Sequence, residues 1–242
     1  MIREAIEYVT GLATKAEEPK TIVIGGRTFA HSSLVEVEDA TQYSLELSSL
    51  TSMIEYVKSK FDTKVHAEAL MIHVVSPTKV ELLGPLVENS RTRYEYCHAI
   101  YCRNGLDVGN KYKPEPFNMA LQMHCEDKHD RAALLKLSGT IGTEKAMTSH
   151  DDGITQQVSV RQGAVLESST RVPNPVTLSP YRTFAEIEQP SSPFVFRVHD
   201  QGPDRLPLLS LSECDGGLWK HTAMQSIAQY MKAALPEITV LA

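Results

Sequence analysis

The side chains best suited to catalysis or metal binding gather between Tyr94 and Asp130. This stretch holds two groups of sulfur and imidazole side chains: Cys97, His98 and Cys102, then His124, Cys125 and His129. Cysteine and histidine are common zinc ligands, and residues four apart on a helix share a face. The second group, His124, Cys125 and His129, is therefore a candidate metal site. Such a site would suit a metal-dependent enzyme acting on nucleotides or nucleic acid.

Interior packing is the competing interpretation of the same residues. Cys125 borders the apolar stripe of an expected helix, and cysteine is often buried in protein cores. Cys97 and Cys102 are an odd number of residues apart on an expected strand, so their thiols would point to opposite faces. We therefore expect these thiols and imidazoles to fill the interior, and we keep the metal site as the alternative.

Acidic residues form two further groups, one around Glu126, Asp127 and Asp130 and one at Asp151 and Asp152. Paired carboxylates can hold Mg²⁺ or exchange protons. Both groups fall at expected turns or helix ends, where exposed charge needs no functional explanation. We expect solvated turns here.

Aromatic and basic residues alternate along the expected strand 91–103. Tyr94, Tyr96 and His98 would line one face, next to Arg91 and Arg93. Single-strand nucleic-acid binders combine stacking rings and cations in this way. The net charge of −6 favours a structural role instead, because affinity for nucleic acid is mainly electrostatic.

Gly216 and Gly217 precede the last expected helix, which begins with Lys220 and His221 in its first turn. Backbone N–H groups at a helix start can bind a phosphate. The chain contains neither G-x-x-x-x-G-K-[ST] nor G-x-G-x-x-G, and no G-x-S-x-G or H-E-x-x-H. We therefore predict a hinge or cap at the glycines, and no cofactor.

Composition places the chain among ordinary globular proteins. Its 242 residues are 42% hydrophobic and 22% charged. This length suffices for one large domain or for two small ones that share a core. Four cysteines do not make a disulfide framework at this length, so we expect free thiols. No stretch approaches the roughly 20 apolar residues of a membrane helix. We expect a protein of the cytoplasm of a bacterial host, without membrane partners.

Periodicity predicts the elements of the first half. Residues 1–16 read as an amphipathic helix and residues 21–30 as a hairpin turning at two glycines. Residues 50–61 read as a helix capped by Ser48 or Ser49, with Phe61 ending its apolar stripe. Two strands surround Ser76–Thr78, the strand 91–103 follows, and residues 113–139 are helical with a break near Asp127 and a stop at Gly139.

A period of two predicts strands in the second half. They cover the segments QQVSVRQGAVLESSTRV, FAEIEQ, FVFRVHD and LPLLSLSEC, before a helix over 218–235 and a final strand EITVLA. The predicted fold class is α+β, with antiparallel sheets mainly in the C-terminal half packed against amphipathic helices. Residues 1–150 would form a helix-rich part and 151–242 a β-rich part of one integrated domain.

The order of these elements resembles the YfdQ-like family of phage and prophage proteins, a domain of unknown function. The resemblance covers roughly Leu50 to Leu235 and rests on LTSMIEYVKSKFD, SPTKVELLGPL, YEYCHAIY and KPEPFNMALQMHCED. The chain keeps Phe117 and Asn118 of an F-N-x-x-x-F block, with Leu121 near the second aromatic position, so the match is partial. The family supplies no catalytic residues. The resemblance implies a phage-encoded protein from an accessory or early region.

The sequence favours a non-enzymatic phage or prophage accessory protein that self-associates and binds a host factor or a small anionic, nucleotide-like ligand. Strand edges such as EITVLA support a homo-oligomer. The ligand contacts would be Arg91, Arg93, Tyr94, Tyr96, Lys220 and His221. A metal-dependent enzyme and a single-strand nucleic-acid-binding protein of phage replication remain open alternatives.

Overall fold

The computed structural model describes twelve segments of the chain: residues 2–17, 21–24, 27–30, 43–62, 70–86, 91–102, 105–143, 146–151, 156–162, 165–171, 174–202 and 205–242. The chain divides into two compact units, Met1–Tyr43 and Ser44–Ala242. None of the described helices combines the length and the apolar composition of a membrane-spanning segment.

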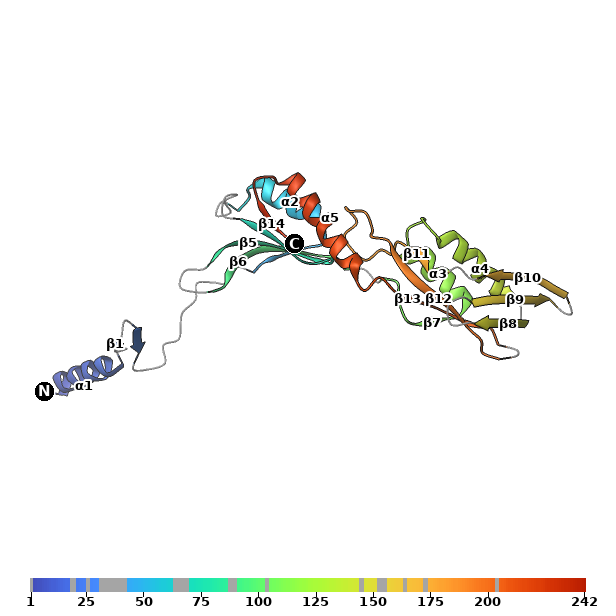
Figure 1. Cartoon of the computed structure of the whole chain (residues 1–242). Helices are drawn as coiled ribbons and strands as arrows, with labels where there is room; N and C mark the ends of the chain where they lie inside the picture. The colour runs from blue at the N-terminus through green and yellow to red at the C-terminus, as the bar shows by residue number, and fades with distance from the viewer. Residues whose placement is uncertain are drawn as a thin grey trace. The chain divides into compact units, whose positions relative to one another are not determined.

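Helices separate groups of consecutive strands along the chain (Figure 1). The helices are α1 (Ile2–Glu17), α2 (Leu50–Ser59), α3 (Pro114–His124), α4 (Arg131–Thr143) and α5 (Leu218–Ala234). The strands are β1 (Thr21–Ile24), β2 (Arg27–Ala30), β3 (Leu45–Leu47), β4 (Met71–Ser76), β5 (Lys79–Leu86), β6 (Arg93–Ile100), β7 (Lys111–Tyr112), β8 (Ala146–Asp151), β9 (Gln156–Gln162), β10 (Val165–Arg171), β11 (Val176–Leu178), β12 (Ser192–His199), β13 (Leu208–Glu213) and β14 (Thr239–Leu241).

The first unit contains α1 and the antiparallel hairpin β1–β2. Both were predicted from the sequence. In the hairpin Ile24 pairs with Arg27, and the two glycines predicted to form its turn lie outside the described residues. The side chains of Ile2 to Gly11 are exposed to solvent along the whole described part of α1.

A five-stranded sheet with the order β14-β4-β5-β6-β3 builds the first core of the second unit. The inner strands pair antiparallel, and the outer strands β14 and β3 each pair parallel with their neighbours. Alternate residues of β4, β5 and β6 are buried, because α2 and α5 pack against that face (Figure 1). Leu50, Met53, Ile54 and Val57 supply the buried face of α2.

A four-stranded antiparallel sheet with the order β11-β12-β13-β7 builds the second core. Phe194, Phe196 and Val198 alternate along β12 and pack with Phe117 and Leu121 of α3. The rings of Phe117 and Phe196 lie 5.6 Å apart between centroids. Strands β8, β9 and β10 form a separate antiparallel sheet.

The segment from Ser179 to Ser191, called the connector below, joins the two cores. Its Phe184 belongs to the first core, where it meets Tyr101 edge-on at 6.1 Å, and the Thr183 hydroxyl donates to the Pro77 carbonyl at 2.5 Å. The buried amide of Gln189 donates to the carbonyls of Thr183 and Phe184. Its oxygen accepts the backbone N–H of Arg182 at 3.0 Å. A buried loop needs such bonds, because unpaired backbone groups are costly away from water.

Most predicted elements are confirmed, and the α+β class with them. Ser49 caps α2 through the Ser52 N–H, the turn at Pro77 and Thr78 joins β4 to β5, and the break after α3 falls at 125–130. Three predictions were wrong. Phe61 lies beyond the end of α2 and is exposed, and Gly139 lies inside α4. The segment FAEIEQ is not a strand, because its apolar residues Phe184 and Ile187 turn inward from the connector.

The connector gives a stability prediction. We expect Gln189→Ala to lower the free energy of unfolding by about 3 kcal/mol, because several buried backbone groups lose their partner at once. Chemical denaturation measures this value. Gln201→Ala, on an exposed side chain, is the matched control and should change it by less than about 0.5 kcal/mol. Equal effects from the two substitutions would contradict the role given to Gln189.

Candidate functional site

The residues proposed for a metal site lie at the end of α3 but do not converge. Helix α3 ends at His124, Cys125 is its C-cap, and His129 lies in a turn with a φ of 55°. The prediction that Cys125 and His129 share a helix face was therefore wrong. Cys125 packs in the second core and pairs with Pro180 of the connector. Among the described residues, no three His, Cys, Asp or Glu side chains are placed to hold a metal ion.

Burial makes the thiol of Cys125 a poor nucleophile and a poor ligand. It raises the pKa of Cys125 to about 11, although Arg131 and Arg182 lower it in part. Burial and the nearby Glu95 likewise raise the pKa of Cys97 to about 12. All four cysteines are free, with Cys97 and Cys125 buried and Cys102 and Cys214 exposed. The expected packing role is confirmed for the two buried thiols.

The acidic residues after α3 are engaged within the fold. Glu126 pairs with Lys128 at 3.1 Å, and Asp127 pairs with Arg131 at 2.9 Å. Asp130 accepts the backbone N–H of Thr177 at 2.7 Å and so ties the start of α4 to β11. Asp151 ends strand β8 and pairs with Gln156, so the predicted turn was wrong at this residue, and Asp152 lies outside the described residues. The three described carboxylates stabilise a turn and a helix start.

A β-bulge divides the aromatic residues of β6. The pairing of β6 with β5 shifts register between Leu82 and Leu83, so the alternation of faces is interrupted near Tyr96. Tyr96 packs against the first core, whereas His98 contacts Glu95 and Ser44 at 2.7 and 2.8 Å. Tyr96 and His98 therefore lie on different faces of β6, and the expectation that Tyr94, Tyr96 and His98 line one face was wrong.

The remaining predicted ligand contacts fall at two separate places. Arg91, Arg93 and Tyr94 are exposed at the start of β6, where Arg93 donates to the Gly84 carbonyl at 3.3 Å. Lys220 and His221 are exposed in the first turn of α5. The first turn of α5 lies next to Arg182, which stacks on Trp219. Thr183, which follows Arg182, donates a hydrogen bond to Pro77. Pro77 lies at one end of the β5–β6 pair and Arg93 lies at the other. The structure does not bring the two sets together.

A carboxylate of the chain already occupies the start of α5. Asp215 accepts the backbone N–H groups of Gly217 and Trp219 at 2.8 and 3.2 Å, and the hydroxyl of Ser192 at 2.7 Å. Burial alone would raise the pKa of Asp215, but these hydrogen bonds and the nearby Arg182 hold it below its ordinary value. The two glycines have φ of 64° and 84°, which suits the predicted cap. Asp215 therefore takes the position that a phosphate would need.

Arg182 is the centre of the densest polar cluster of the second unit. Its guanidinium contacts Glu213 of β13, Ser192 of β12 and the Pro190 carbonyl. It also stacks over the ring of Trp219, 4.0 Å from the centroid. The side chain is only 13% exposed, so its charge must be compensated by these partners. The cluster positions the connector, β12, β13 and α5 against one another.

Four of these polar residues were not predicted as functional from the sequence: Arg182, Gln189, Glu213 and Asp215. The only signal was polar residues set among apolar ones, as in YRTF and SECDGG, and loops commonly carry such residues. Hydrogen-bond partners such as Arg182 and Glu213 are 31 positions apart, and only the folded register brings them together.

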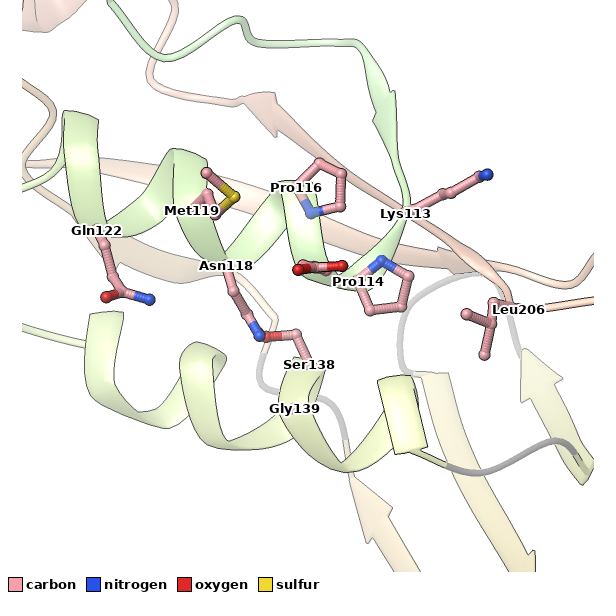
Figure 2. Close-up of a pocket in the computed structure, with 10 residues that line it drawn as sticks. Lys113, Pro114, Pro116, Asn118, Met119, Gln122, Ser138, Gly139 and Leu206 are labelled. Atoms are coloured by element: carbon pink, nitrogen blue, oxygen red, sulfur yellow. The ribbon is translucent and has the colours of Figure 1, made fainter.

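A pocket of about 510 Å³ opens between α3 and α4 (Figure 2). Pro114, Pro116, Met119 and Leu206 supply apolar walls. Asn118 and Ser138 point toward each other across the helices and are hydrogen-bonded. The Ser138 hydroxyl also contacts the Leu134 carbonyl at 2.7 Å, so no base activates it as a nucleophile. None of the predicted site residues lines this pocket.

Comparisons with known proteins give no relative: no family model, no curated protein and no solved structure matches the chain. The resemblance to the YfdQ-like family therefore stays a prediction.

Thiol reactivity tests the assignment of the cysteines. At pH 8 we expect an alkylating reagent to modify Cys102 and Cys214 in the native protein and to reach Cys97 and Cys125 only after unfolding. Both buried thiols are shielded and protonated, since burial raises their pKa values. Mass spectrometry of the intact chain counts the adducts. Rapid native modification of Cys125 would restore it as a catalytic candidate.

The Asp215 cap gives a pH-dependent prediction. The pKa of Asp215 is lowered in the folded protein. The stabilisation of the folded state by its carboxylate is therefore complete above the ordinary Asp pKa and is lost as the pH falls through the lowered value. We expect Asp215→Asn to lower the free energy of unfolding by about 1 kcal/mol at pH 7. The difference from the parent chain should narrow below about pH 4. The exposed Glu237→Gln variant is the control. If the difference in unfolding free energy between Asp215→Asn and the parent chain stays constant with pH, the role of Asp215 as a charged cap is contradicted.

Proposed function

We propose that this chain is a non-catalytic binding protein that works as a homo-oligomer. The observation that carries the proposal is the exposed apolar face of α1. Ile2, Ile6 and Val9 are 80%, 60% and 63% exposed, and they lie on one side of the helix. With Ala5 and Thr10 they line a shallow groove of about 320 Å³.

With 16 residues, α1 is only slightly longer than the roughly 12–15 residues below which isolated helices are marginal in water. Most helical stability in proteins comes from an apolar face that is covered. The opposite side of α1 is polar, with Arg3 and Glu7 forming an exposed ion pair at 3.4 Å. The apolar face therefore needs a partner.

A second copy of α1 is the partner that we propose for this face. Ile2 and Val9 are seven residues apart with Ala5 between them, which is the spacing that helices use when they pair along a common seam. The same face on two copies is self-complementary, as a two-fold contact requires. Small Ala5 next to larger Ile2 and Ile6 lets the two helices approach closely.

The second unit supports binding rather than catalysis. Two of the four thiols, Cys97 and Cys125, are buried with raised pKa values, and the acids Glu126 and Asp127 that follow Cys125 are paired. We propose that the assembled protein binds a host factor or a small anionic ligand, in the phage or prophage context that the YfdQ-like resemblance implies. The proposed contacts for an anion are exposed Arg91 and Arg93 at one place and Lys220 and His221 at another.

Substitution in the α1 face tests the proposal. We expect Ile6→Asp to weaken self-association at least roughly tenfold, because a carboxylate would be buried without a partner in the helix pair. Sedimentation equilibrium over a range of concentrations gives the dissociation constant.

Gly11→Asp is the matched control, since it places the same carboxylate on the opposite side of α1. The site is exposed and an added Cβ there meets nothing within 4 Å. This variant should associate like the parent chain. A parent chain that sediments as a monomer at all concentrations would refute the proposed function.

A further inference from the structure

Four neighbouring strands of the five-stranded sheet each place one polar side chain at the same level. His73 of β4 pairs with Glu81 of β5, Glu81 pairs with His98 of β6, and His98 pairs with Glu46 of β3. Histidine and glutamate therefore alternate across the sheet, in the order His73, Glu81, His98, Glu46. We call these four residues the histidine–glutamate row, which spans about 14 Å at ordinary strand spacing.

The row lies on the sheet face opposite α2 and α5. Each of its members stands between two apolar neighbours in the sequence, as in Ile72-His73-Val74 and Cys97-His98-Ala99. On the inner strands these neighbours are buried under the helices, so the polar residue between them points to the other face. In Figure 1 both helices lie on one side of this sheet. His73 and Glu46, the ends of the row, are 43% and 73% exposed.

Apolar side chains flank the row on the same face. By alternation from His73 and His98 they include Met71 and Ile100, and Leu241 of β14 extends the row beyond His73. Val75 lies where the pairing of β4 with β5 shifts register, at the end of the same strand. Val75 and Leu241 are exposed large hydrophobics. Exposed apolar side chains beside a row of alternating charge give this face both apolar area and polar groups for a protein contact.

The charged groups of this face contact one another within the chain. Glu81 accepts from Lys79 at 2.6 Å and lies 3.8 Å from His73. His98 contacts Glu95 and Ser44 through Nδ1, and its Nε2 lies 4.0 Å from Glu46. Charges of opposite sign therefore alternate along the row when both imidazoles are protonated. In neutral His98 the N–H lies on Nδ1 toward Glu95, and Nε2 is an acceptor.

We propose that this face binds the same face of a second copy of the chain. A half turn about an axis that runs along the strands, between β5 and β6, reverses the order of the row. His73 then faces Glu46 of the second copy, and Glu81 faces His98 of the second copy. Every imidazole meets a carboxylate. The two sheets would pack face to face with aligned strands, an ordinary packing of antiparallel sheets.

Other occupants fit this face less well. Nucleic acid requires a surface of one positive sign, whereas the row alternates and the chain carries a net charge of −6. A metal ion requires converging ligands, and the described residues hold no such group of three. The order of the row is complementary to its own reverse, and that property points to a second copy.

This inference rests on the proposed homo-oligomer, and the test separates the two. The experiment uses the full chain carrying Ile6→Asp, which removes the α1 contact and leaves the sheet contact. In that background we expect a residual dimer. Glu46→Lys should weaken it roughly tenfold, because a lysine then faces His73 of the second copy at both ends of the row. His73→Glu should weaken it similarly, because two carboxylates then meet.

The double variant Glu46→Lys with His73→Glu places lysine opposite glutamate again and should recover most of the lost affinity. Glu237→Lys makes the same charge change at an exposed position outside the row and should leave the dissociation constant unchanged. Thermal unfolding of each variant verifies that the chain is folded. We expect the variants to fold, because the side chains of His73 and Glu46 are partly exposed and can be replaced without disturbing the core.

The outcomes are distinct. Weakening by the single variants and recovery in the double variant would support the sheet contact. Two outcomes would overturn this inference and leave the proposed function standing, provided that the parent chain self-associates. In the first, no dimer remains after Ile6→Asp. In the second, the dimer remains but the row variants do not change its dissociation constant. A monomeric parent chain would overturn both.

Discussion

The buried charge of Arg182 is the constraint on which the rest of the second unit depends. Burial lowers the pKa of Arg182, while the carboxylates of Glu213 and Asp215 favour its charged form. A guanidinium in this position cannot be left unpaired, because an isolated buried charge costs several kcal/mol. Its partners come from β12, β13 and the turn before α5. These elements must therefore assemble together with the connector.

This constraint also explains why the two cores depend on each other. The backbone of Arg182 is held by Gln189, and the next residues, Thr183 and Phe184, reach the turn after β4 and the first core. Trp219 brings the start of α5 to the guanidinium, and Ile227 and Met231 further along the same helix cover the five-stranded sheet. A change at the cluster would act on both sheets, although it lies far from most of their residues in sequence.

Local sequence patterns predicted what local physics determines. The apolar spacing of Leu50, Met53, Ile54 and Val57, with Ser49 before it, was enough to predict α2, and Pro77 was enough to predict the turn after β4. Local patterns failed where contacts between residues far apart in the sequence determine the structure. FAEIEQ alternates like a strand, but Phe184 and Ile187 pack inward from a loop that Gln189 bonds. Gly139 is tolerated inside α4, next to the pocket between α3 and α4.

The candidate sites were harder to predict, for the same reason. The histidines and cysteines near position 124 are close in sequence, but the helix ends between them and sends Cys125 into the core. The bulge near Tyr96 redirects one face of β6, and spacing alone gives no sign of it. The histidine–glutamate row is the converse case, since its members are spread from position 46 to position 98 and meet only through the pairing of four strands. Proximity along the chain is a weak guide to chemistry when strands set the geometry.

The outer strands of the five-stranded sheet, β3 and β14, contain three residues each. An outer strand this short exposes few backbone amides and carbonyls, so a strand of another molecule would gain little by docking alongside it. Continuous growth of this sheet from molecule to molecule, the route to fibrils, is correspondingly disfavoured. Copies of this chain that meet through faces can instead form assemblies of finite size.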